Sequence, residues 1–108
     1  MLCGLFDWHI RWSGDAKLGG HTIHVGGDMS YVAVYARGEM REAAPNDYDT
    51  VGTMNHIGVV VDDLDAVEAR VLAAGFETTN HGDYEPGRRF YFHDHDGIEF
   101  EVVSYAAP

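Results

Sequence analysis

Five ionisable side chains in the second half of the sequence fall at alternating positions of segments that read as β-strands. They are His56, Arg89, Tyr91, Glu99 and Glu101. Since successive side chains of a strand point to opposite faces, this alternation predicts that the five share one sheet face. Imidazole and carboxylate groups on such a face could exchange protons with a bound molecule. The pattern predicts a polar, lined cavity, and the alternative interpretation is the solvated outer face of an antiparallel sheet.

A helix and four strands are predicted around these side chains. Asp62 and Asp63 as N-cap candidates, an apolar stripe at helical spacing and Gly75 after the last turn predict a helix over residues 64–74. Strands are expected near residues 55–61, 76–79, 89–93 and 98–104. The apolar sheet face should pack on the helix, and these side chains should be buried together: Leu64, Val67, Val71, Phe90, Phe92, Ile98 and Phe100.

The first half of the chain reads as a partial copy of the second. TIHVGGDMSYVAVYAR aligns with FYFHDHDGIEFEVVSY, which predicts a hairpin of residues 21–25 and 31–35. Residues 6–12 should form the end of a helix and an edge strand. We therefore expect a single domain over residues 1–108, with a partial module at 1–36, a linker at 37–53 and a complete module at 54–105.

The second half is similar to a known family in the segments MNHIGVVVDDLDAVEARVLAAGF and GRRFYFHDHDGIEFEVVSY. They resemble the second half of a protein of the glyoxalase/bleomycin-resistance/extradiol-dioxygenase (vicinal oxygen chelate) superfamily. The resemblance implies an α+β fold, in which paired βαβββ modules form a curved, mostly antiparallel sheet cup. The first module would lack its first strand and most of its first helix.

The resemblance also implies a divalent-metal site, with His56 and Glu101 at the two ligand positions of the second module. Imidazole plus carboxylate suits Fe(II), Mn(II), Ni(II) or Zn(II), and Glu101 would also shuttle a proton. Ala33 stands where the family has a glutamate in the first module, so only half of the metal site is expected. The substrate pocket is predicted from side chains that share a strand face, with core packing as the alternative for the two tyrosines of the first module: Tyr31, Ala33, Tyr35, Arg89, Tyr91 and Glu99.

The other histidines are weaker candidates. His9, His21 or His24 could replace the missing metal ligands, although no spacing favours any of them, and each is interpreted as an ordinary strand or surface residue. His93 and His95 have the spacing of metal ligands, but they flank Asp94 next to an Asp-Gly turn signal. We interpret both as turn residues.

Composition narrows the classes of function. The net charge of −11 disfavours nucleic acid and anionic membrane surfaces as partners. The single cysteine, Cys3, cannot form an internal disulfide, which fits the cytoplasm. Neither a membrane-spanning run nor a signal peptide is recognisable.

Three functions remain open at the level of sequence. The first is a protein that binds a small molecule in the sheet-lined cup, with or without a divalent metal. The second is a metal-dependent lyase or extradiol dioxygenase of the glyoxalase type, and the third is a truncated scaffold without catalysis. We also expect a homodimer, because a first module without its leading strand exposes a sheet edge.

Overall fold

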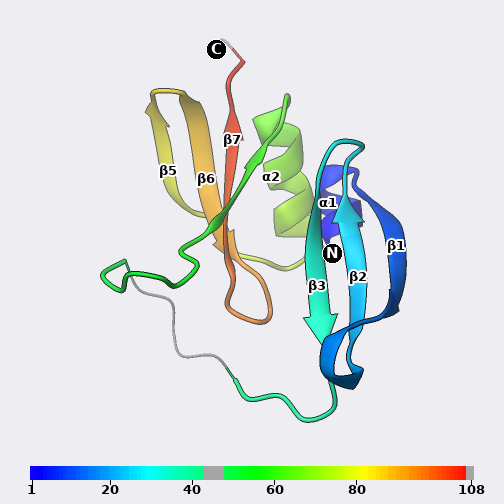
Figure 1. Ribbon diagram of the computed structural model, residues 1–108. Helices are drawn as coiled ribbons and strands as arrows, with labels where there is room; N and C mark the ends of the chain where they lie inside the picture. Colours follow the sequence, from blue (N-terminus) through cyan, green and yellow to red (C-terminus); the bar gives the residue numbers. More distant parts are fainter. Residues whose placement is uncertain (43–47, 107–108) are drawn as a thin grey trace. The chain divides into compact units, whose positions relative to one another are not determined.

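The computed structural model describes residues 1–42 and 48–106, and the chain divides into two compact units, Met1–Ala43 (unit 1) and Ala44–Pro108 (unit 2) (Figure 1). The predicted linker, residues 37–53, includes residues 43–47, which lie outside the described residues. No helix in the described ranges is long and apolar enough to cross a membrane.

Unit 1 is a three-stranded antiparallel sheet with a short helix. Helix α1 (Leu2–Phe6) precedes β1 (His9–Asp15), a 3-10 turn η1 (Lys17–Gly19), β2 (His21–Gly26) and β3 (Tyr31–Ala36), in the sheet order β1-β2-β3. The β2–β3 hairpin, and a helix end followed by an edge strand, agree with the prediction. Leu5 and Phe6 of α1 are buried, as is Val25 of β2.

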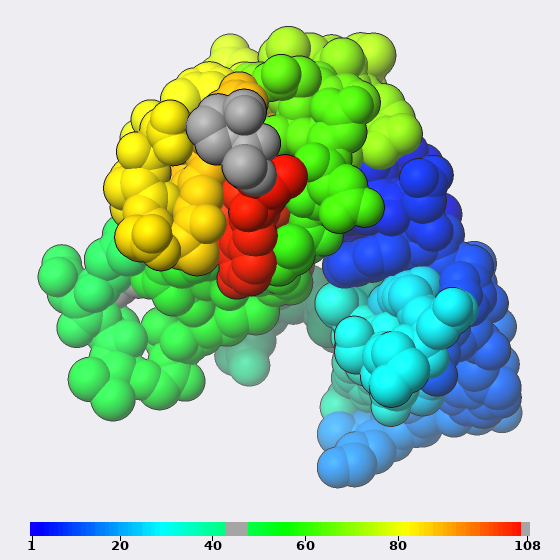
Figure 2. All heavy atoms as spheres, turned by 90° about the horizontal axis from the view of Figure 1, so that it is seen from above, coloured from blue at the N-terminus to red at the C-terminus, as the bar shows by residue number. Residues whose placement is uncertain are grey.

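Unit 2 is a complete strand–helix–strand–strand–strand module. It consists of β4 (Ile57–Val60), α2 (Leu64–Ala73), β5 (Thr79–Tyr84), β6 (Gly87–His93) and β7 (Glu99–Ser104), with the sheet order β4-β7-β6-β5. Strands β4 and β7 pair in parallel, whereas β5–β6 and β6–β7 pair antiparallel. The predicted α+β class with mostly antiparallel sheets is therefore confirmed. In Figure 2, β7 is seen between the β5–β6 hairpin and the segment around β4.

Helix α2 begins and ends as predicted. The Asp63 side chain accepts a hydrogen bond from the Ala66 amide (3.0 Å), which caps the first turn. Gly75 adopts φ +95° just past the helix, a conformation that glycine tolerates best. The sequence therefore specifies this helix locally at both ends.

The apolar face of the sheet packs on α2, which contacts β6 and β7. Phe90, Phe92, Val71 and Val102 are fully buried. Of the side chains predicted to form this core, Ile98 is only half-buried, because it precedes β7 at the end of the turn. The rest of the predicted set is buried: Leu64, Val67, Val71, Phe90, Phe92 and Phe100.

The predicted position of one strand is wrong. Residues 76–79 were expected to form a strand, but β5 is Thr79–Tyr84. The Phe76 amide still donates to the Val71 carbonyl at the end of α2 (3.3 Å), and its ring packs on Phe92 with centroids 5.5 Å apart. The apolar signal at Phe76 therefore belongs to the helix end and the core. The strand itself is a polar edge strand with a register shift between Thr79 and Gly82, so it carries no alternating apolar pattern.

Candidate functional site

Strand register brings the predicted polar residues together on the sheet face opposite α2. Tyr91 pairs with Glu101, and Glu101 also pairs with Gly58 on its other side. His93 pairs with Glu99 one step along the same face. We call the group His56, Arg89, Tyr91, Glu99 and Glu101 the polar face.

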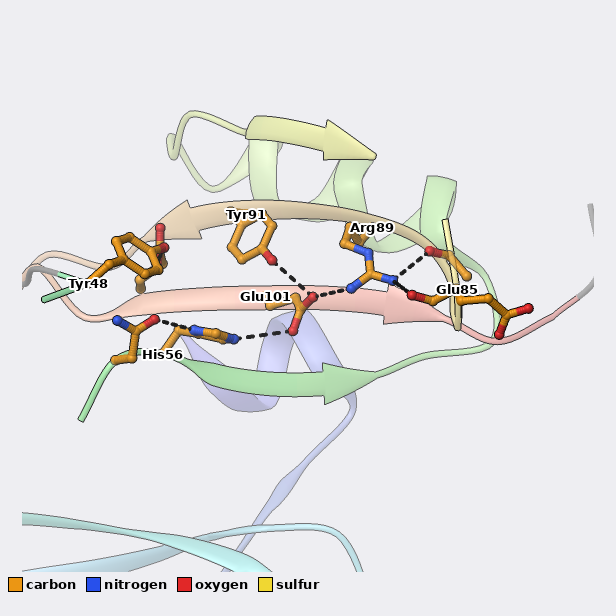
Figure 3. Close-up of polar contacts among 9 residues, drawn as sticks. Tyr48, His56, Glu85, Arg89, Tyr91 and Glu101 are labelled. Carbon is orange, nitrogen blue, oxygen red and sulfur yellow. Dashed lines mark hydrogen bonds and ion pairs between the residues drawn. The ribbon is translucent and has the colours of Figure 1, made fainter. Parts of the chain in front are cut away.

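Glu101 is the centre of the polar face (Figure 3). One of its oxygens, Oε2, accepts hydrogen bonds from Arg89 Nη1 (2.8 Å) and from the Tyr91 hydroxyl (3.1 Å). The other oxygen, Oε1, lies 3.4 Å from His56 Nε2. The parity prediction is confirmed in geometry, because His56 approaches Glu101 and not the apolar face. Only 14% of the Glu101 side chain is exposed, so its contacts are mainly with protein groups.

Arg89 is buried, and its guanidinium is committed to protein acceptors. Besides Glu101, it donates from Nη2 to the carbonyl oxygens of Tyr84 (3.0 Å), Glu85 (3.0 Å) and Gly87 (3.1 Å). It also lies over the Tyr84 ring, 4.0 Å from the centroid. Burial acts to lower the pKa of Arg89, but the hydrogen bond to Glu101 and the neighbouring groups outweigh it and raise the pKa. Arg89 thus ties the β5–β6 turn to Glu101.

Tyr91 donates a hydrogen bond to Glu101. Burial, followed by the hydrogen bond to Glu101, raises the pKa of Tyr91 to about 12. The phenol therefore stays protonated at neutral pH. Its ring meets the His56 ring edge-on, with centroids 5.9 Å apart.

The position of the proton on His56 follows from Asn55. His56 Nδ1 lies 2.6 Å from Asn55 Oδ1. An amide oxygen only accepts hydrogen bonds, so Nδ1 carries the hydrogen in this arrangement. A neutral His56 then presents the lone pair of Nε2 to Glu101 Oε1, and two acceptors face each other across 3.4 Å. A proton between the two atoms satisfies both, as does a cation or a hydrogen-bond donor that reaches both from beside them.

Glu99 forms a second acceptor site on the polar face. It is buried, with 4% of the residue exposed. The hydroxyl of Tyr48, a loop residue, donates to Glu99 Oε1, and His93 Nε2 lies 3.7 Å from Oε2. The hydrogen bond to Glu99 raises the pKa of Tyr48, and burial and the charges of Glu99 and Glu101 are smaller causes in the same direction.

The interpretation of His93 as a turn residue is wrong, because His93 is the last residue of β6 and pairs with Glu99. The strand continues to His93 because the turn begins with Asp94. The Asp94 side chain accepts hydrogen bonds from the amides of Asp96 and Ile98, both 2.9 Å. His95 lies in the turn, as predicted, beside the Phe76 ring.

Three contributors to the site were missed by the analysis of the sequence. Tyr48 and Asn55 lie in the segment before β4, and Tyr84 ends the polar edge strand β5. None belongs to a periodic pattern, and the Tyr48–Glu99 contact spans 51 positions of the chain. The only local signal was the adjacency of Asn55 to His56.

The pocket residues predicted in the first half belong to unit 1. Tyr31, Ala33 and Tyr35 alternate along β3 and therefore share one face of its sheet. His24 pairs with Ala33 on that face and stacks on the Tyr31 ring, with centroids 4.0 Å apart. Tyr35 donates a hydrogen bond to the Lys17 carbonyl (2.6 Å).

The donors present do not complete a metal site. Within residues 1–42 and 48–106, no three histidine, cysteine, aspartate or glutamate side chains gather in a way that could hold a metal ion. His56 and Glu101 together supply two donors of suitable chemistry. Among the candidate substitutes, His24 stacks on Tyr31, and His9 and His21 are exposed at the starts of β1 and β2. A site of the type implied by the resemblance needs a further donor.

Comparison with known proteins identifies a family for this chain. The family model described as the Glyoxalase/Bleomycin resistance protein/Dioxygenase superfamily matches residues 2–102. Among curated proteins there is no match.

Solved structures of this superfamily have a similar fold. A glyoxylase/bleomycin resistance protein/dioxygenase domain from Frankia sp. EAN1pec is 19% identical with a TM-score of 0.75, over 95% of this chain and 82% of that one. The fosfomycin resistance protein FosX from Mesorhizobium loti is 26% identical with a TM-score of 0.68, over 94% and 75%. A mutant FosX from Listeria monocytogenes, in complex with Mn(II) and 1S,2S-dihydroxypropylphosphonic acid, is 21% identical with a TM-score of 0.67, over 94% and 76%. The chain belongs to the Glyoxalase/Bleomycin resistance protein/Dioxygenase superfamily.

Proposed function

We propose that this chain binds a small molecule on the polar face of the unit 2 sheet. The observation that carries the proposal is the facing pair of acceptors, His56 Nε2 and Glu101 Oε1, held 3.4 Å apart so that one donor beside the pair could reach both. An ordinary solvated sheet face has no reason to fix such a pair with a buried arginine on one side and an asparagine on the other. Superfamily membership supports small-molecule binding in general.

Space beside the acceptors supports the same proposal. Gly58 lies next to Glu101 in the β4–β7 pair, and a Cβ atom at Gly58 would be 3.6 Å from Glu101 Oε1. The absent side chain leaves room where a ligand would contact Oε1. Tyr91 and Glu99 flank this position on the same face, so they would contact a ligand bound there.

Amide and side-chain NMR shifts test this proposal. The protein is titrated, without added metal, with a mixed set of neutral, cationic and anionic small molecules. Saturable shifts should gather at His56, Tyr91 and Glu101, and Glu101→Gln should remove them. Glu77→Gln is the matched control, because Glu77 is an exposed carboxylate that precedes β5. Absence of any saturable shift on the polar face would contradict the proposal and favour a scaffold without ligand.

A divalent metal held in part by His56 and Glu101 is the second candidate. Metal-binding histidines commonly donate their other ring nitrogen to a nearby acceptor, and His56 donates from Nδ1 to Asn55 in this way. The Mn(II) in a FosX structure belongs to that protein, but it makes the same metal a sensible probe here. Since the described residues offer two suitable donors, a third would have to come from elsewhere, such as a second copy of the chain.

Metal content of protein purified without an affinity tag tests the second candidate. Stoichiometric Mn, Fe, Ni or Zn that is lost in both His56→Ala and Glu101→Gln would support it. Metal that stays bound in both variants would contradict it. The proton-shuttle role of Glu101, in a lyase or a dioxygenase, depends on this second candidate and stays a prediction.

A further inference from the structure

We infer that the polar face takes a small organic cation that carries an amino group, in preference to an organic anion. This inference rests on the proposed function and adds the chemical class of the ligand. It follows from which groups of the polar face still have hydrogen-bonding capacity and which have already used it.

The single guanidinium of the polar face has no capacity left for an anion. Arg89 is 8% exposed, and both terminal nitrogens are bound, to Glu101 and to the backbone carbonyls of the β5–β6 turn. Its Nε is buried and has no hydrogen-bond partner in the described part of the chain, so it too is out of reach of a ligand in solution. A carboxylate or phosphate that approached the polar face would meet no available cationic donor from Arg89.

His56 and Glu101, in contrast, have side chains that are 31% and 14% exposed, and they keep acceptor capacity for a further donor. His56 Nε2 and Glu101 Oε1 are 3.4 Å apart, so one ammonium nitrogen at about 2.9 Å from each could donate to both. Glu99 accepts a hydrogen bond from the hydroxyl of Tyr48, a loop residue that is 67% exposed. A ligand hydroxyl could take the place of that exposed phenol. The arrangement thus fits an amine with a second donor group.

The charge of the residues around the polar face also favours a cation. Residues 44–108 contain 13 of the 18 acidic residues of the chain and three of its seven basic ones. Besides Arg89, these are Arg88, which pairs with Asp65 of α2 (2.9 Å), and Arg70, which is exposed on α2 itself. Since α2 covers the opposite sheet face, neither offsets the two carboxylates of the polar face. The net field attracts cations and repels anions.

Matched pairs of amines and carboxylic acids test this inference directly. Tyramine and 4-hydroxyphenylacetate share a phenol and differ in the charge of the other end, and benzylamine and benzoate form a pair without the phenol. Dissociation constants are measured by NMR titration of the full chain at about pH 7.5, where histidine is ordinarily mostly neutral. A chelator is present, because a bound divalent cation would itself reverse the local charge.

The amine of each pair should bind at least about tenfold more tightly than the acid, an effect of a single well-placed charge pair. Its affinity should fall in Glu99→Gln and in Glu101→Gln by a similar factor. Glu77→Gln removes the same charge elsewhere in unit 2 and should change the affinity by less than about twofold. Tyr48→Phe should strengthen tyramine binding, because it frees Glu99.

Equal or tighter binding of the acids would overturn the inference, as would an equal loss of amine affinity in Glu77→Gln. Amines that do not bind while other small molecules shift the polar face would also overturn it and leave the proposed function standing. If no small molecule shifts the NMR signals of the polar face, the proposed function itself is wrong, and the inference that rests on it is wrong as well. Circular dichroism of each variant establishes that a lost affinity does not come from unfolding.

Discussion

His56 Nε2 lies 3.4 Å from Glu101 Oε1, although His56 directly precedes β4, the first strand of the βαβββ module, and Glu101 lies in β7, the last. Parallel pairing of β4 with β7 makes this contact possible, because it places the start of β4 beside the start of β7. Arg89 holds the other carboxylate oxygen and Asn55 holds the other ring nitrogen. Both partners are therefore held by neighbouring residues, and we expect a ligand to bind beside the pair, within reach of both atoms.

The Arg89–Glu101 pair should be strongly coupled. Both side chains are largely buried, at 9% and 14% exposed, so removal of one charge leaves the other uncompensated. We expect Glu101→Gln to lower the free energy of unfolding by about 3 kcal/mol. A double-mutant cycle with Arg89→Met, measured by urea denaturation, should give a coupling energy above about 1 kcal/mol.

The exposed pair Arg88–Asp65 provides the matched control for this cycle. Its side chains are 46% and 74% exposed, and its coupling should be below about 1 kcal/mol. Equal coupling in the two cycles would show that burial does not strengthen the Arg89–Glu101 pair, and our account of how Glu101 is held would be wrong.

Tyr91 should give the protein a steep loss of stability at high pH. Its pKa is raised from 10.0 to about 12 in the folded state, so the folded protein retains a proton that the unfolded chain loses. The stabilisation is complete below about pH 10 and is lost as the pH rises towards 12. Tyr91→Phe should reduce the slope of unfolding free energy against pH in that window. Identical slopes for the two proteins would contradict the shift.

Glu68 should cause a loss of stability at low pH, whereas Tyr91 causes one at high pH. Burial acts to raise its pKa, but the hydrogen bonds from Thr78 (2.5 Å) and His81 (2.6 Å) outweigh burial and lower it from 4.5. The stabilisation is therefore present above about pH 4.5 and is lost as the pH falls through the lowered folded-state pKa.

Glu68→Gln should cost about 1–2 kcal/mol at neutral pH, as expected for hydrogen bonds to a charged group. The difference from the unmodified protein should shrink in acid. Denaturation curves at several pH values measure this difference, with Glu77→Gln as the control for loss of one surface charge. A difference that is constant with pH would refute the assignment to ionised Glu68.

Gly58 should control access to Glu101. A Cβ atom at this position would lie 3.6 Å from Glu101 Oε1, which is ordinary contact, whereas a longer side chain would fill the space in front of that oxygen. We expect Gly58→Leu to weaken ligand or metal binding at least about tenfold with little change in stability, since a strand accepts Leu better than Gly. Gly58→Ala should weaken it much less. Comparable binding by the Leu variant and the unmodified protein would place the ligand elsewhere.

The protein should form a homodimer through unit 1. Strand β1 is an edge of its sheet and carries two large exposed apolar side chains, Ile10 (59%) and Trp12 (51%). Pairing of this edge with a second copy would cover both. Light scattering at micromolar concentration should give about twice the mass of one 12.0 kDa chain.

Ile10→Lys should shift this assembly towards the monomer, because a charged residue on an edge strand opposes edge pairing. Met29→Lys is the control, since Met29 is 94% exposed in the β2–β3 turn. A monomeric mass for the unmodified protein would refute the dimer. A dimer equally sensitive to both substitutions would place the interface elsewhere.

The sequence by itself determined the face on which the residues of β6 and β7 lie. Alternation of Arg89 and Tyr91 with Phe90 and Phe92 is a local property of extended backbone, and burial of the phenylalanines against α2 leaves the polar pair on the other face. The helix was equally predictable, because its cap at Asp63 and its stop at Gly75 depend on neighbouring residues alone.

Only the tertiary structure decided what holds these polar groups. The carbonyl acceptors of Arg89 come from a turn after an edge strand with no apolar pattern, and the donor to Glu99 comes from Tyr48, which is 51 positions away. Asn55 adjoins His56, but its role became visible only when the parallel β4–β7 pair directed Nε2 towards Glu101. The alternating pattern in the sequence reflects burial, because every second residue of a strand faces the core. Hydrogen bonds from loops and backbone carbonyls leave no periodic trace, because each depends on where separate segments meet in space.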